Sequence, residues 1–290
     1  MINIDIHKKL QGSNGDMNLD INLNIEENSF VAISGKSGSG KTTFLRILAG
    51  LESAEGSLKV QDNIWLDNIW LDNKKSLAVQ ERDIGFVFQD YALFPNMNVL
   101  DNLLFVNKDK KLAQHLLELT ELTKLTKRLP NTLSGGQQQR VSLCRAFMRK
   151  PKLLLMDEPL SALDPSMRIK LQADILKLHK EFKTTTIMVS HDPSEIYKLA
   201  SRVVVLENGK ITKDGVPKEI LLQTSGSQKF SLRGEIIDIV QADIIFVAIV
   251  AIGQQIVEVV LDEDEALSFK IGQSVNISTK AFAPSLSSNY

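Results

Sequence analysis

The sequence predicts an α/β fold followed by a small β-domain, and three observations lead to this expectation. Strand-like and helix-like runs alternate along the first part of the chain, as in a sheet covered by helices. One strand-like run, residues 153–156, contains only apolar side chains, which is typical of a strand buried on both faces. Beyond Gly226 and Ser227 the composition changes, and strand-like runs follow one another without a long helix. We therefore expect an α/β domain at residues 1–225 and a small β-domain at residues 229–290.

The individual elements follow from periodicity and turn residues. Apolar and polar side chains alternate in residues 2–6 and 19–25, which is the period of half-buried strands, with a turn at residues 12–16 between them. Further strands are expected at residues 30–33, 56–60, 84–88, 153–156, 184–189, 203–206, 235–240, 244–250, 256–261 and 274–279. Helical patterns cover residues 43–49, 99–129, 138–148 and 166–182.

A short direct repeat interrupts this pattern. The residues Asp62–Leu66 recur at once as Asp67–Leu71. A five-residue period fits neither a strand nor a helix, so both copies cannot keep one face buried in a single regular element. We expect one copy to pair in the sheet while the other lengthens a hairpin or bulges out. Because surface loops accept insertions readily, a tolerated duplication is favoured over a partner-binding loop.

Composition limits the class of protein. The chain has 290 residues and is 43% hydrophobic, which supports a substantial core. Its 34 basic and 35 acidic residues nearly cancel, so we expect no nucleic acid among its partners. The single Cys144 excludes an intramolecular disulfide and suits a reducing compartment. The longest apolar stretch, residues 236–252, includes two aspartates and is too polar to span a bilayer, and the N-terminus lacks a signal-peptide pattern.

Residues 35–42 match the phosphate-loop spacing G-x-x-x-x-G-K-[ST] at every fixed position, between a strand-like and a helix-like run. In such a loop, backbone N–H groups converge on phosphate oxygens, and the next helix directs its positive end at the same anion. Lys41 would neutralise the β- and γ-phosphates, and the Thr42 hydroxyl would bind Mg²⁺. A Gly/Ser-rich turn with a chance lysine is the alternative. The expected nucleotide-binding residues are Gly35, Lys36, Ser37, Gly38, Ser39, Gly40, Lys41, Thr42 and Thr43.

Two carboxylates follow the apolar strand at residues 153–156. Asp157 and Glu158 come directly after it, at the carboxyl end of a strand, where ligands bind in open α/β sheets. An acidic turn without chemistry is the alternative. The position after four apolar residues favours a binding role.

Together with four further motifs in a fixed order, the phosphate loop makes residues 1–225 resemble the nucleotide-binding subunit of ATP-binding-cassette (ABC) transporters. Leu133–Gln137, with the sequence Leu-Ser-Gly-Gly-Gln, matches the signature sequence of this family. The resemblance implies a P-loop ATPase with a RecA-like core, an antiparallel β-subdomain and a helical subdomain at about residues 90–145. It also implies a head-to-tail dimer of two copies, in which the ATP held by one copy is capped by the other through Ser134, Gly135, Gly136 and Gln137.

The same resemblance implies roles for five single residues. Asp157 matches the Walker B carboxylate that holds Mg²⁺, and Glu158 matches the general base that polarises the attacking water. Gln89 resembles the residue that contacts the metal and signals to the membrane subunits. His191 resembles the switch histidine at the γ-phosphate, and Asp164 corresponds to the loop that communicates between the two sites. ATP and Mg²⁺ are the expected cofactors.

The sequence departs from the family near the expected base. Many cassettes stack an aromatic side chain on adenine, yet residues 1–29 contain no Phe, Tyr or Trp. His7 or an aliphatic side chain such as Leu10 would take this place, which weakens base discrimination. Nucleotide affinity would then rest mainly on phosphate contacts.

The resemblance also suggests a cargo and partners. Residues 87–95 and 137–141 look like those of importers of oxyanions, iron and polyamines, and the last 60 or so residues look like one oligonucleotide-binding-type (TOBE) β-barrel domain. The segment 272–282 is similar to the molybdate-binding version, which favours molybdate or tungstate over sulfate, iron(III) or polyamine. The β-domain would then bind oxyanion. Separate transmembrane permease subunits are the implied partners, which places the chain peripherally at the cytoplasmic face of the cell membrane.

Two other classes compete with a transport ATPase. Soluble ABC proteins of repair or translation carry long coiled-coil insertions or two cassettes, and this chain shows neither. A nucleotide kinase or a simple GTPase would share the phosphate loop but would not need Leu133–Gln137. Substitution of Ser134 separates these classes, because only a cassette dimer would lose hydrolysis while still binding ATP.

Overall fold

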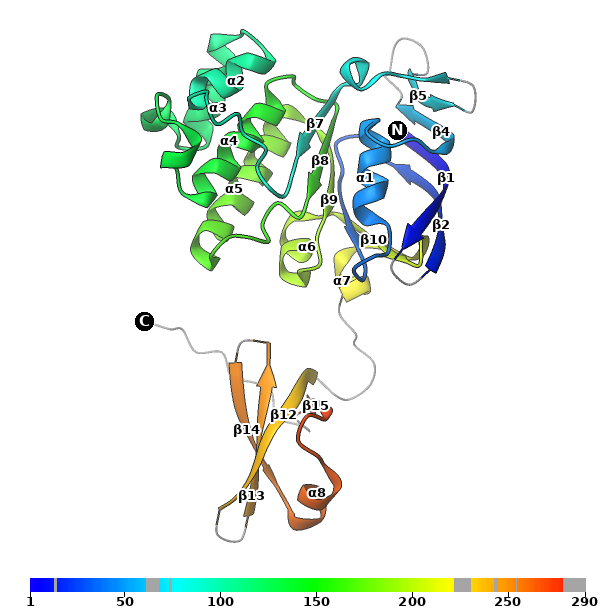
Figure 1. Cartoon of the computed structure of the whole chain (residues 1–290), viewed down its shortest axis with the longest axis vertical. Coiled ribbons are helices and arrows are strands. Elements are labelled where there is room, and N and C mark those ends of the chain that lie inside the picture. Colours follow the sequence, from blue (N-terminus) through cyan, green and yellow to red (C-terminus); the bar gives the residue numbers. More distant parts are fainter. Residues whose placement is uncertain are drawn as a thin grey trace. The chain divides into compact units, whose positions relative to one another are not determined.

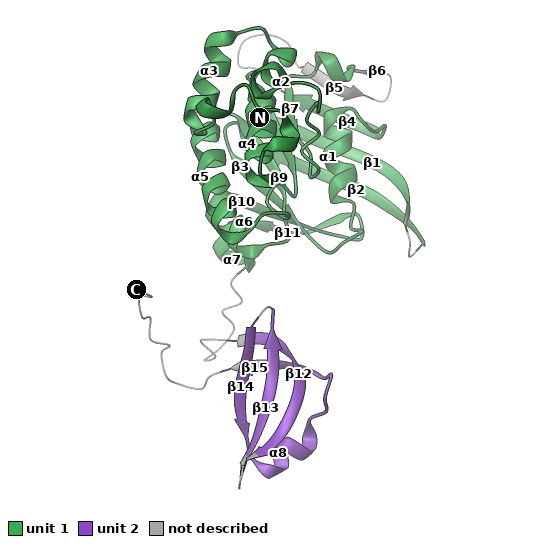
Figure 2. Cartoon of the chain, turned by 60° about the vertical axis from the view of Figure 1, so that its left-hand side comes forward, with its two compact units in different colours: residues 1–222 green, residues 223–290 purple. Residues whose placement is uncertain are grey.

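The computed structural model describes residues 1–12, 15–60, 68–72, 75–221, 231–242, 245–253 and 255–278. The chain divides into two compact units, Met1–Leu222 and Gln223–Tyr290 (Figure 2). In the described residues each unit has hydrophobic core clusters of its own. The division lies close to the composition change at Gly226.

One mixed sheet of 11 strands runs through the first unit (Figure 1). Its strand order in the described residues is β6-β5-β4-β1-β2-β11-β10-β3-β9-β8-β7. The strands are β1 (Ile2–Gly12), β2 (Gly15–Ile25), β3 (Phe30–Ser34), β4 (Glu55–Val60), β5 (Asn68–Asp72), β6 (Lys75–Ser76), β7 (Ile84–Val87), β8 (Leu153–Asp157), β9 (Thr185–Val189), β10 (Arg202–Glu207) and β11 (Lys210–Gly215).

The strands β10, β3, β9, β8 and β7 pair in parallel, and this part of the sheet is covered on both faces. Leu153 and Leu155 of β8 join the core on one face, and Leu154 and Met156 join the core on the other. A strand between two cores has no solvent-facing position for a polar side chain. The predicted burial of this strand on both faces is therefore confirmed.

Helices of the first unit pack on both faces of the sheet (Figure 1). One core joins α1 to strands β1, β2 and β4, and the other core joins α2, α3, α4 and α5 to the opposite face of β8 and β9. The helices are α1 (Lys41–Ala49), α2 (Val99–Val106), α3 (Lys110–Leu119), α4 (Gly135–Phe147), α5 (Pro165–Phe182), α6 (Pro193–Leu199) and α7 (Pro217–Leu221), with the short 3₁₀ helices η1 (Val79–Glu81), η2 (Thr123–Leu125) and η3 (Pro130–Thr132).

The hairpin β1–β2 is longer than the sequence predicted. The two strands pair from Ile2↔Ile25 to Gly12↔Gly15, so the predicted turn at residues 12–16 is mostly strand. Near the tip, Leu10 pairs with Met17. The sequence did not show this extension, because residues 7–12 lack the alternation of polar and apolar side chains that marks a half-buried strand.

Caps divide the helical region differently from the prediction. The run expected at residues 99–129 consists of α2, α3 and η2, because Asn98 and Asp109 accept hydrogen bonds from backbone N–H groups and begin new helices. Helix α4 begins at Gly135 rather than residue 138. Ser134 and Gln137 form a capping box there, with the Ser134 N–H donating to Gln137 Oε1 at 3.0 Å.

Asn68–Leu71, the described residues of the second copy, lie in β5, which pairs with β4 as predicted for one copy. The register shifts between Leu58 and Lys59 in this pair. The first copy, Asp62–Leu66, lies outside the described residues.

The second unit is a four-stranded antiparallel sheet with the order β14-β13-β12-β15 and one short helix. Its elements are β12 (Ser231–Ala242), β13 (Ile245–Ile252), β14 (Gln255–Leu261), α8 (Glu263–Ser268) and β15 (Ser274–Ser278). Ile236, Ala248, Val250 and Leu261 form its core. The pairings among the described residues make an open sheet, and closure into a barrel stays a prediction.

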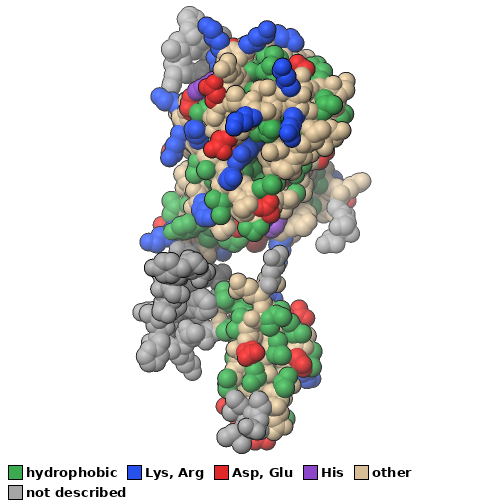
Figure 3. Space-filling model, turned by 90° about the vertical axis from the view of Figure 1, so that its left-hand side faces the viewer, with side chains coloured by type: hydrophobic (Ala, Val, Ile, Leu, Met, Phe, Trp, Pro, Cys, Tyr) green, Lys and Arg blue, Asp and Glu red, His purple; other side chains and the backbone are tan. Residues whose placement is uncertain are grey.

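The surfaces of the two units differ in the view of Figure 3. Lysine and arginine side chains are interspersed with acidic ones over the first unit, whereas many hydrophobic side chains reach the surface of the second (Figure 3). Two of the exposed apolar residues of β14 are Ile256 and Val260, at 68% and 64% exposure. In the described part of the chain, no helix is long and apolar enough to cross a membrane.

Candidate functional site

Four loops that follow neighbouring parallel strands carry most of the predicted site. Gly35 follows β3, Glu158 follows β8, His191 comes two residues after β9, and Gln89 comes two residues after β7. Since β3, β9, β8 and β7 are adjacent and parallel, their carboxyl ends lie at one edge of the sheet. The predicted residues thus come from distant parts of the sequence to one edge.

The phosphate loop takes a backbone path that glycine allows. Gly35, Gly38 and Gly40 have φ values of 144°, 79° and 97°, which side chains rarely tolerate. A Cβ at Gly35 would also lie 2.1 Å from the carbonyl oxygen of Leu206 in β10. Gly40 then caps the N-terminus of α1, whose first turn begins with Lys41. The loop therefore places backbone N–H groups at a helix N-terminus, which is a ready anion site.

Lys41 is held inside this loop. Its side-chain Nζ donates to the carbonyl oxygens of Gly35 at 2.8 Å and of Lys36 at 2.7 Å, and the residue is 8% exposed. Burial lowers the pKa of Lys41, and the nearby carboxylates of Glu158 and Asp157 oppose this shift. A cation held only by carbonyl oxygens can exchange them for phosphate oxygens, which bind it more strongly.

Thr42 and Asp157 form a pair that fits a magnesium ion. The Thr42 hydroxyl donates to Asp157 Oδ1 at 3.2 Å, and two oxygens that share an octahedral Mg²⁺ lie ~3 Å apart. Burial raises the pKa of Asp157, while the Thr42 hydrogen bond lowers it. No cluster of three or more His, Cys, Asp or Glu side chains in the described residues could hold a metal. The pair suits a cation that takes its remaining ligands from water and phosphate.

Glu158 and His191 lie beside each other. Their closest atoms, Glu158 Oε1 and His191 Nδ1, are 3.4 Å apart. The backbone of Glu158 is left-handed, with φ of 44°, and its N–H donates to the carbonyl oxygen of Val189 at 3.1 Å. A non-glycine residue in this conformation is strained and persists only where its surroundings impose it. The strained turn brings the carboxylate beside the histidine, where a base and a phosphate contact can act together.

A cavity of about 970 Å³ is lined by most of these groups, although Asp157 is not among its lining residues. The phosphate loop with Thr43, Glu158 and His191 line one part of it, and Leu10, Gln11 and Met17 of the β1–β2 hairpin line another. The cavity is large enough for a nucleotide. Ser39 is not among the lining residues, and its side chain is buried.

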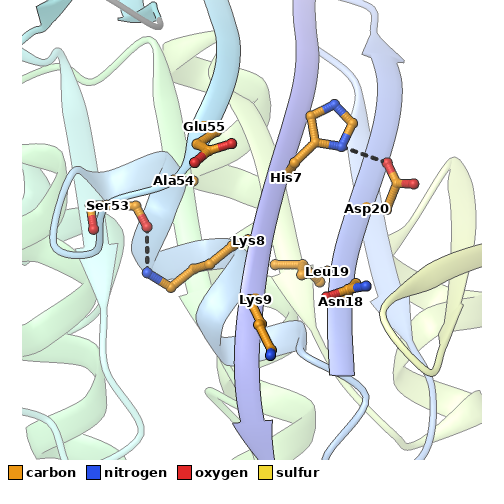
Figure 4. A pocket seen from close by; sticks show the side chains of 9 residues that line it. All are labelled: His7, Lys8, Lys9, Asn18, Leu19, Asp20, Ser53, Ala54 and Glu55. Atoms are coloured by element: carbon orange, nitrogen blue, oxygen red, sulfur yellow. Dashed lines mark hydrogen bonds and ion pairs between the residues drawn. The ribbon is translucent and has the colours of Figure 1, made fainter. Parts of the chain in front are cut away.

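His7 lines a different cavity, of about 540 Å³ (Figure 4). The two cavities share Lys8 and Lys9 of β1 as lining residues. The Nδ1 atom of His7 lies 2.9 Å from Asp20 Oδ1 on the neighbouring strand. Lys8, which lines both cavities, donates to the carbonyl oxygen of Ser53 at 2.5 Å. Of the two candidates for the base position, Leu10 rather than His7 therefore borders the phosphate-loop cavity.

The remaining predicted residues lie outside this cavity in the single chain. Ser134, Gly135, Gly136 and Gln137 form the N-terminus of α4, with the hydroxyl of Ser134 engaged in the capping box. Asp164 caps α5, and hydrogen bonds from the Met167 N–H and the Ser166 hydroxyl lower its pKa.

Gln89 is exposed and is not among the lining residues.

The comparisons with known proteins agree with this geometry. A model of the ABC transporter family matches residues 19–161. The chain is 44% identical over 208 residues to a protein of Chlorella vulgaris named as a probable sulfate/thiosulfate import ATP-binding protein, and it covers 85% of that relative. This chain belongs to the ABC transporter family. The same alignment covers 69% of this chain.

Other members of the ABC family differ in length and cargo. A sulfate/thiosulfate import ATP-binding protein of Mesostigma viride is 43% identical, with 74% of this chain and 62% of that protein aligned. An oligosaccharides import ATP-binding protein of Bacillus subtilis is 41% identical, with 69% and 55% aligned. The chain thus spans little more than half the length of these two relatives.

A solved ABC cassette has the same fold as the first unit. The dimeric structure of MJ0796, a bacterial ABC transporter cassette, superposes with a TM-score of 0.62 at 31% identity. The match covers 75% of this chain and 99% of that chain. The ABC cassette fold predicted from the motifs is therefore confirmed for the first unit.

Three charged residues of the first unit were not found from the ABC motifs. Arg82 is buried and donates to the carbonyl oxygens of Ile47 and Leu48, at the end of α1. Arg168 and the buried Glu195 lie next to His191 and line a further cavity with it. In a sequence, a buried charged residue cannot be told from a charged residue on the surface, because most charged residues are exposed. The burial of Arg82 and Glu195 is therefore seen only in the structure.

Proposed function

We propose that this chain is the ATP-hydrolysing subunit of an ABC importer. The observation that carries the proposal is that Lys41, Thr42, Glu158 and His191 line one cavity, and that Asp157 accepts a hydrogen bond from Thr42 beside it. These are the groups that phosphoryl transfer to water requires: an anion cradle, metal ligands and a base. ATP and Mg²⁺ are the proposed ligands.

Each group has a proposed role in hydrolysis. Backbone N–H groups of the loop and the Lys41 ammonium hold the β- and γ-phosphates. Thr42 and Asp157 would bind Mg²⁺, which neutralises charge on the phosphates. Glu158 orients the attacking water and accepts its proton. His191, 3.4 Å from Glu158, contacts the γ-phosphate and keeps the carboxylate in place.

The proposed active form is a head-to-tail dimer of two copies. In one copy the signature residues Ser134–Gln137 lie on α4, away from the cavity, so they reach a nucleotide only if it is held by another copy. The similarity to a cassette solved as a dimer supports this arrangement. The exposed Gln89 would remain available to the metal and to the membrane subunits. The chain would then work peripherally, at the cytoplasmic face of the membrane, with separate permease subunits.

For the cargo, the relatives favour sulfate or thiosulfate over molybdate. Two of the relatives described above are named for sulfate/thiosulfate import and one for oligosaccharide import. The resemblance of segment 272–282 to a molybdate-binding domain has no counterpart among these names, so molybdate and tungstate become the second candidates. Calorimetric titration of the full chain with sulfate, thiosulfate, molybdate and tungstate tests whether the C-terminal unit binds oxyanion.

The dimer and the base are tested with one substitution. Glu158→Gln keeps the phosphate contacts but removes the proton acceptor, so an ATP-bound dimer should accumulate. Gel filtration with Mg-ATP should show this variant at twice the monomer mass, and phosphate release should fall by about 100-fold or more. Glu207→Gln, at an exposed position at the end of β10, serves as the matched control and should behave as the native chain.

Two outcomes would contradict the proposal. If the Glu158→Gln protein stays monomeric with saturating Mg-ATP, the proposed head-to-tail dimer is wrong. A Ser134→Ala protein with full hydrolysis would indicate a kinase-like or GTPase-like enzyme instead of a cassette.

A further inference from the structure

Beside the proposed active site, charged side chains connect the first turn of α5 to the loop that carries His191. We propose that Arg168, on α5, is a positioning residue that holds this loop in the geometry needed for ATP hydrolysis. The proposal rests on the role proposed above for His191. It concerns a residue to which the sequence motifs gave no role.

His191 has little packing of its own. Its side chain is 66% exposed, and its contact with Glu158 is long, at 3.4 Å. Such a ring is placed mainly by the backbone on either side of it. Whatever fixes residues 190 and 192 therefore fixes the position of the histidine at the nucleotide.

The flanking residues are fixed by a set of hydrogen bonds around one buried carboxylate. Ser190 donates its hydroxyl to Glu195 Oε2 at 2.7 Å and accepts from the Asp192 N–H at 3.1 Å. Asp192 in turn caps α6, accepting from the N–H groups of Ser194 at 2.8 Å and Glu195 at 3.3 Å. These bonds connect both neighbours of His191 to each other through Glu195.

Arg168 supplies the positive charge of this set. Its Nη1 donates to Asp192 Oδ2 at 3.0 Å, and its Nε lies 3.5 Å from Glu195 Oε1. The Glu195 side chain is only 5% exposed, and burial raises its pKa. Without the guanidinium, the buried carboxylate loses its cation and would have to turn outward or take up a proton. Either change breaks or weakens the bond to Ser190.

Arg168 also connects the loop to the residue proposed to communicate between the two sites. The backbone N–H of Arg168 donates to the backbone carbonyl oxygen of Asp164 at 2.9 Å, in the first turn of α5. Arg168 lines the same cavity, of about 360 Å³, as Glu158 and His191. A movement of the loop at residues 158–164 would therefore reach His191 through Arg168.

The test compares two arginine substitutions in the full chain. Arg168→Met keeps the apolar stem but removes the guanidinium, and the control Arg202→Met removes an ion pair of similar exposure, with Asp214, away from the site. Arg168→Met should lower kcat for Mg-ATP by about 10- to 100-fold, as expected for a misplaced reacting group, while KM and the Kd for ATP change by less than about threefold. Arg202→Met should keep the native kcat. Arg168→Lys should recover part of kcat, because an ammonium group can serve one of the two carboxylates.

A double variant shows whether Arg168 acts through His191. If it does, Arg168→Met combined with His191→Ala should have the same kcat as His191→Ala alone. The inference would be overturned if the two substitutions lowered kcat independently, so that the double variant had a lower kcat than His191→Ala alone. A native kcat in Arg168→Met would also overturn it. An equal loss of kcat in Arg202→Met would show an effect of stability alone and would also overturn it.

The same measurements separate this inference from the proposed function. A native kcat in His191→Ala would overturn the role of His191 and, with it, the positioning by Arg168. A low kcat in His191→Ala with a native kcat in Arg168→Met would overturn only the positioning.

Discussion

Met17 and Leu10 line the cavity beside the phosphate loop, near Gly40. They pair across the β1–β2 hairpin and line the cavity with aliphatic rather than aromatic surface. Base stacking on an aromatic ring contributes about 1–3 kcal/mol, and these side chains supply less. Phosphate contacts around Lys41 would therefore dominate nucleotide affinity.

We expect this chain to bind ATP and GTP with affinities within about tenfold of each other, because aliphatic contacts discriminate weakly between bases. Met17→Tyr should tighten binding of both nucleotides by about fivefold or more through stacking. Equilibrium titration with each nucleotide measures this. Lys41→Ala should weaken the binding of ATP and of GTP equally. A native chain that binds ATP more than about 100-fold more tightly than GTP would contradict the expectation.

Cys144 should be inert in the folded chain. The thiol is fully buried against Thr120 and Leu116, and burial raises its pKa to about 12. At pH 8 only about one thiol in 10⁴ would be ionised, and thiolate is the reactive form. A colorimetric thiol reagent should therefore detect no sulfhydryl in the native chain and one after denaturation. Rapid labelling under native conditions would show that the helical core around α4 opens.

Single residues of the site could be predicted where a motif fixes both type and spacing. Lys41, Thr42, Asp157, Glu158 and His191 lie close together in the structure, and their roles stay predictions. Arg82, Arg168 and Glu195 could not be found this way, since their roles depend on burial and on partners far away in sequence. Spacing carries information about local geometry but none about long-range pairing.

At the scale of elements, the helix that follows the phosphate loop is anchored at its far end. Arg82, just after η1, donates to the carbonyl oxygens of Ile47 at 2.9 Å, Leu48 at 2.8 Å and Leu77 at 3.1 Å. The last carbonyls of a helix have no partner within the helix, and a positive charge there is favourable. Gly50 leaves room for the guanidinium, because a Cβ at this position would lie 2.7 Å from it.

Arg82→Met should destabilise the chain by about 2–3 kcal/mol, because it leaves buried carbonyl oxygens without their charged donor. Urea unfolding followed by circular dichroism measures this loss. Arg46→Met, on the exposed side of the same helix, is the matched control and should cost less than about 1 kcal/mol. Equal losses in the two variants would show that the anchor at the end of α1 contributes little.

The order of strands and helices in the first unit was predictable, but several boundaries were not. Fully apolar runs such as residues 153–156 indicate buried strands directly. The extension of β1 and β2 to Leu10 and Met17 depends on cross-strand pairing, which local alternation does not reveal. The N-cap at Asp109 divides an apolar pattern that reads as one helix, since side-chain caps override periodicity.

For the whole molecule, the main feature is that the two units have separate cores. The clusters of the first unit and that of the second share no residues in the described chain. A protein truncated after Leu222 should therefore keep its unfolding midpoint and bind Mg-ATP as the full chain does. Calorimetry of both proteins tests this. A lower midpoint, or a loss of nucleotide binding, would show that the second unit stabilises the first.

The left-handed backbone of Glu158 has a consequence for attempts to make this protein more durable. Glycine accepts such a conformation freely, so Glu158→Gly should raise the free energy of unfolding by roughly 0.5–1 kcal/mol after allowing for the extra chain entropy of glycine. The same change removes the proton acceptor for water. A screen that selects only for survival on heating would therefore enrich variants that bind ATP but do not hydrolyse it.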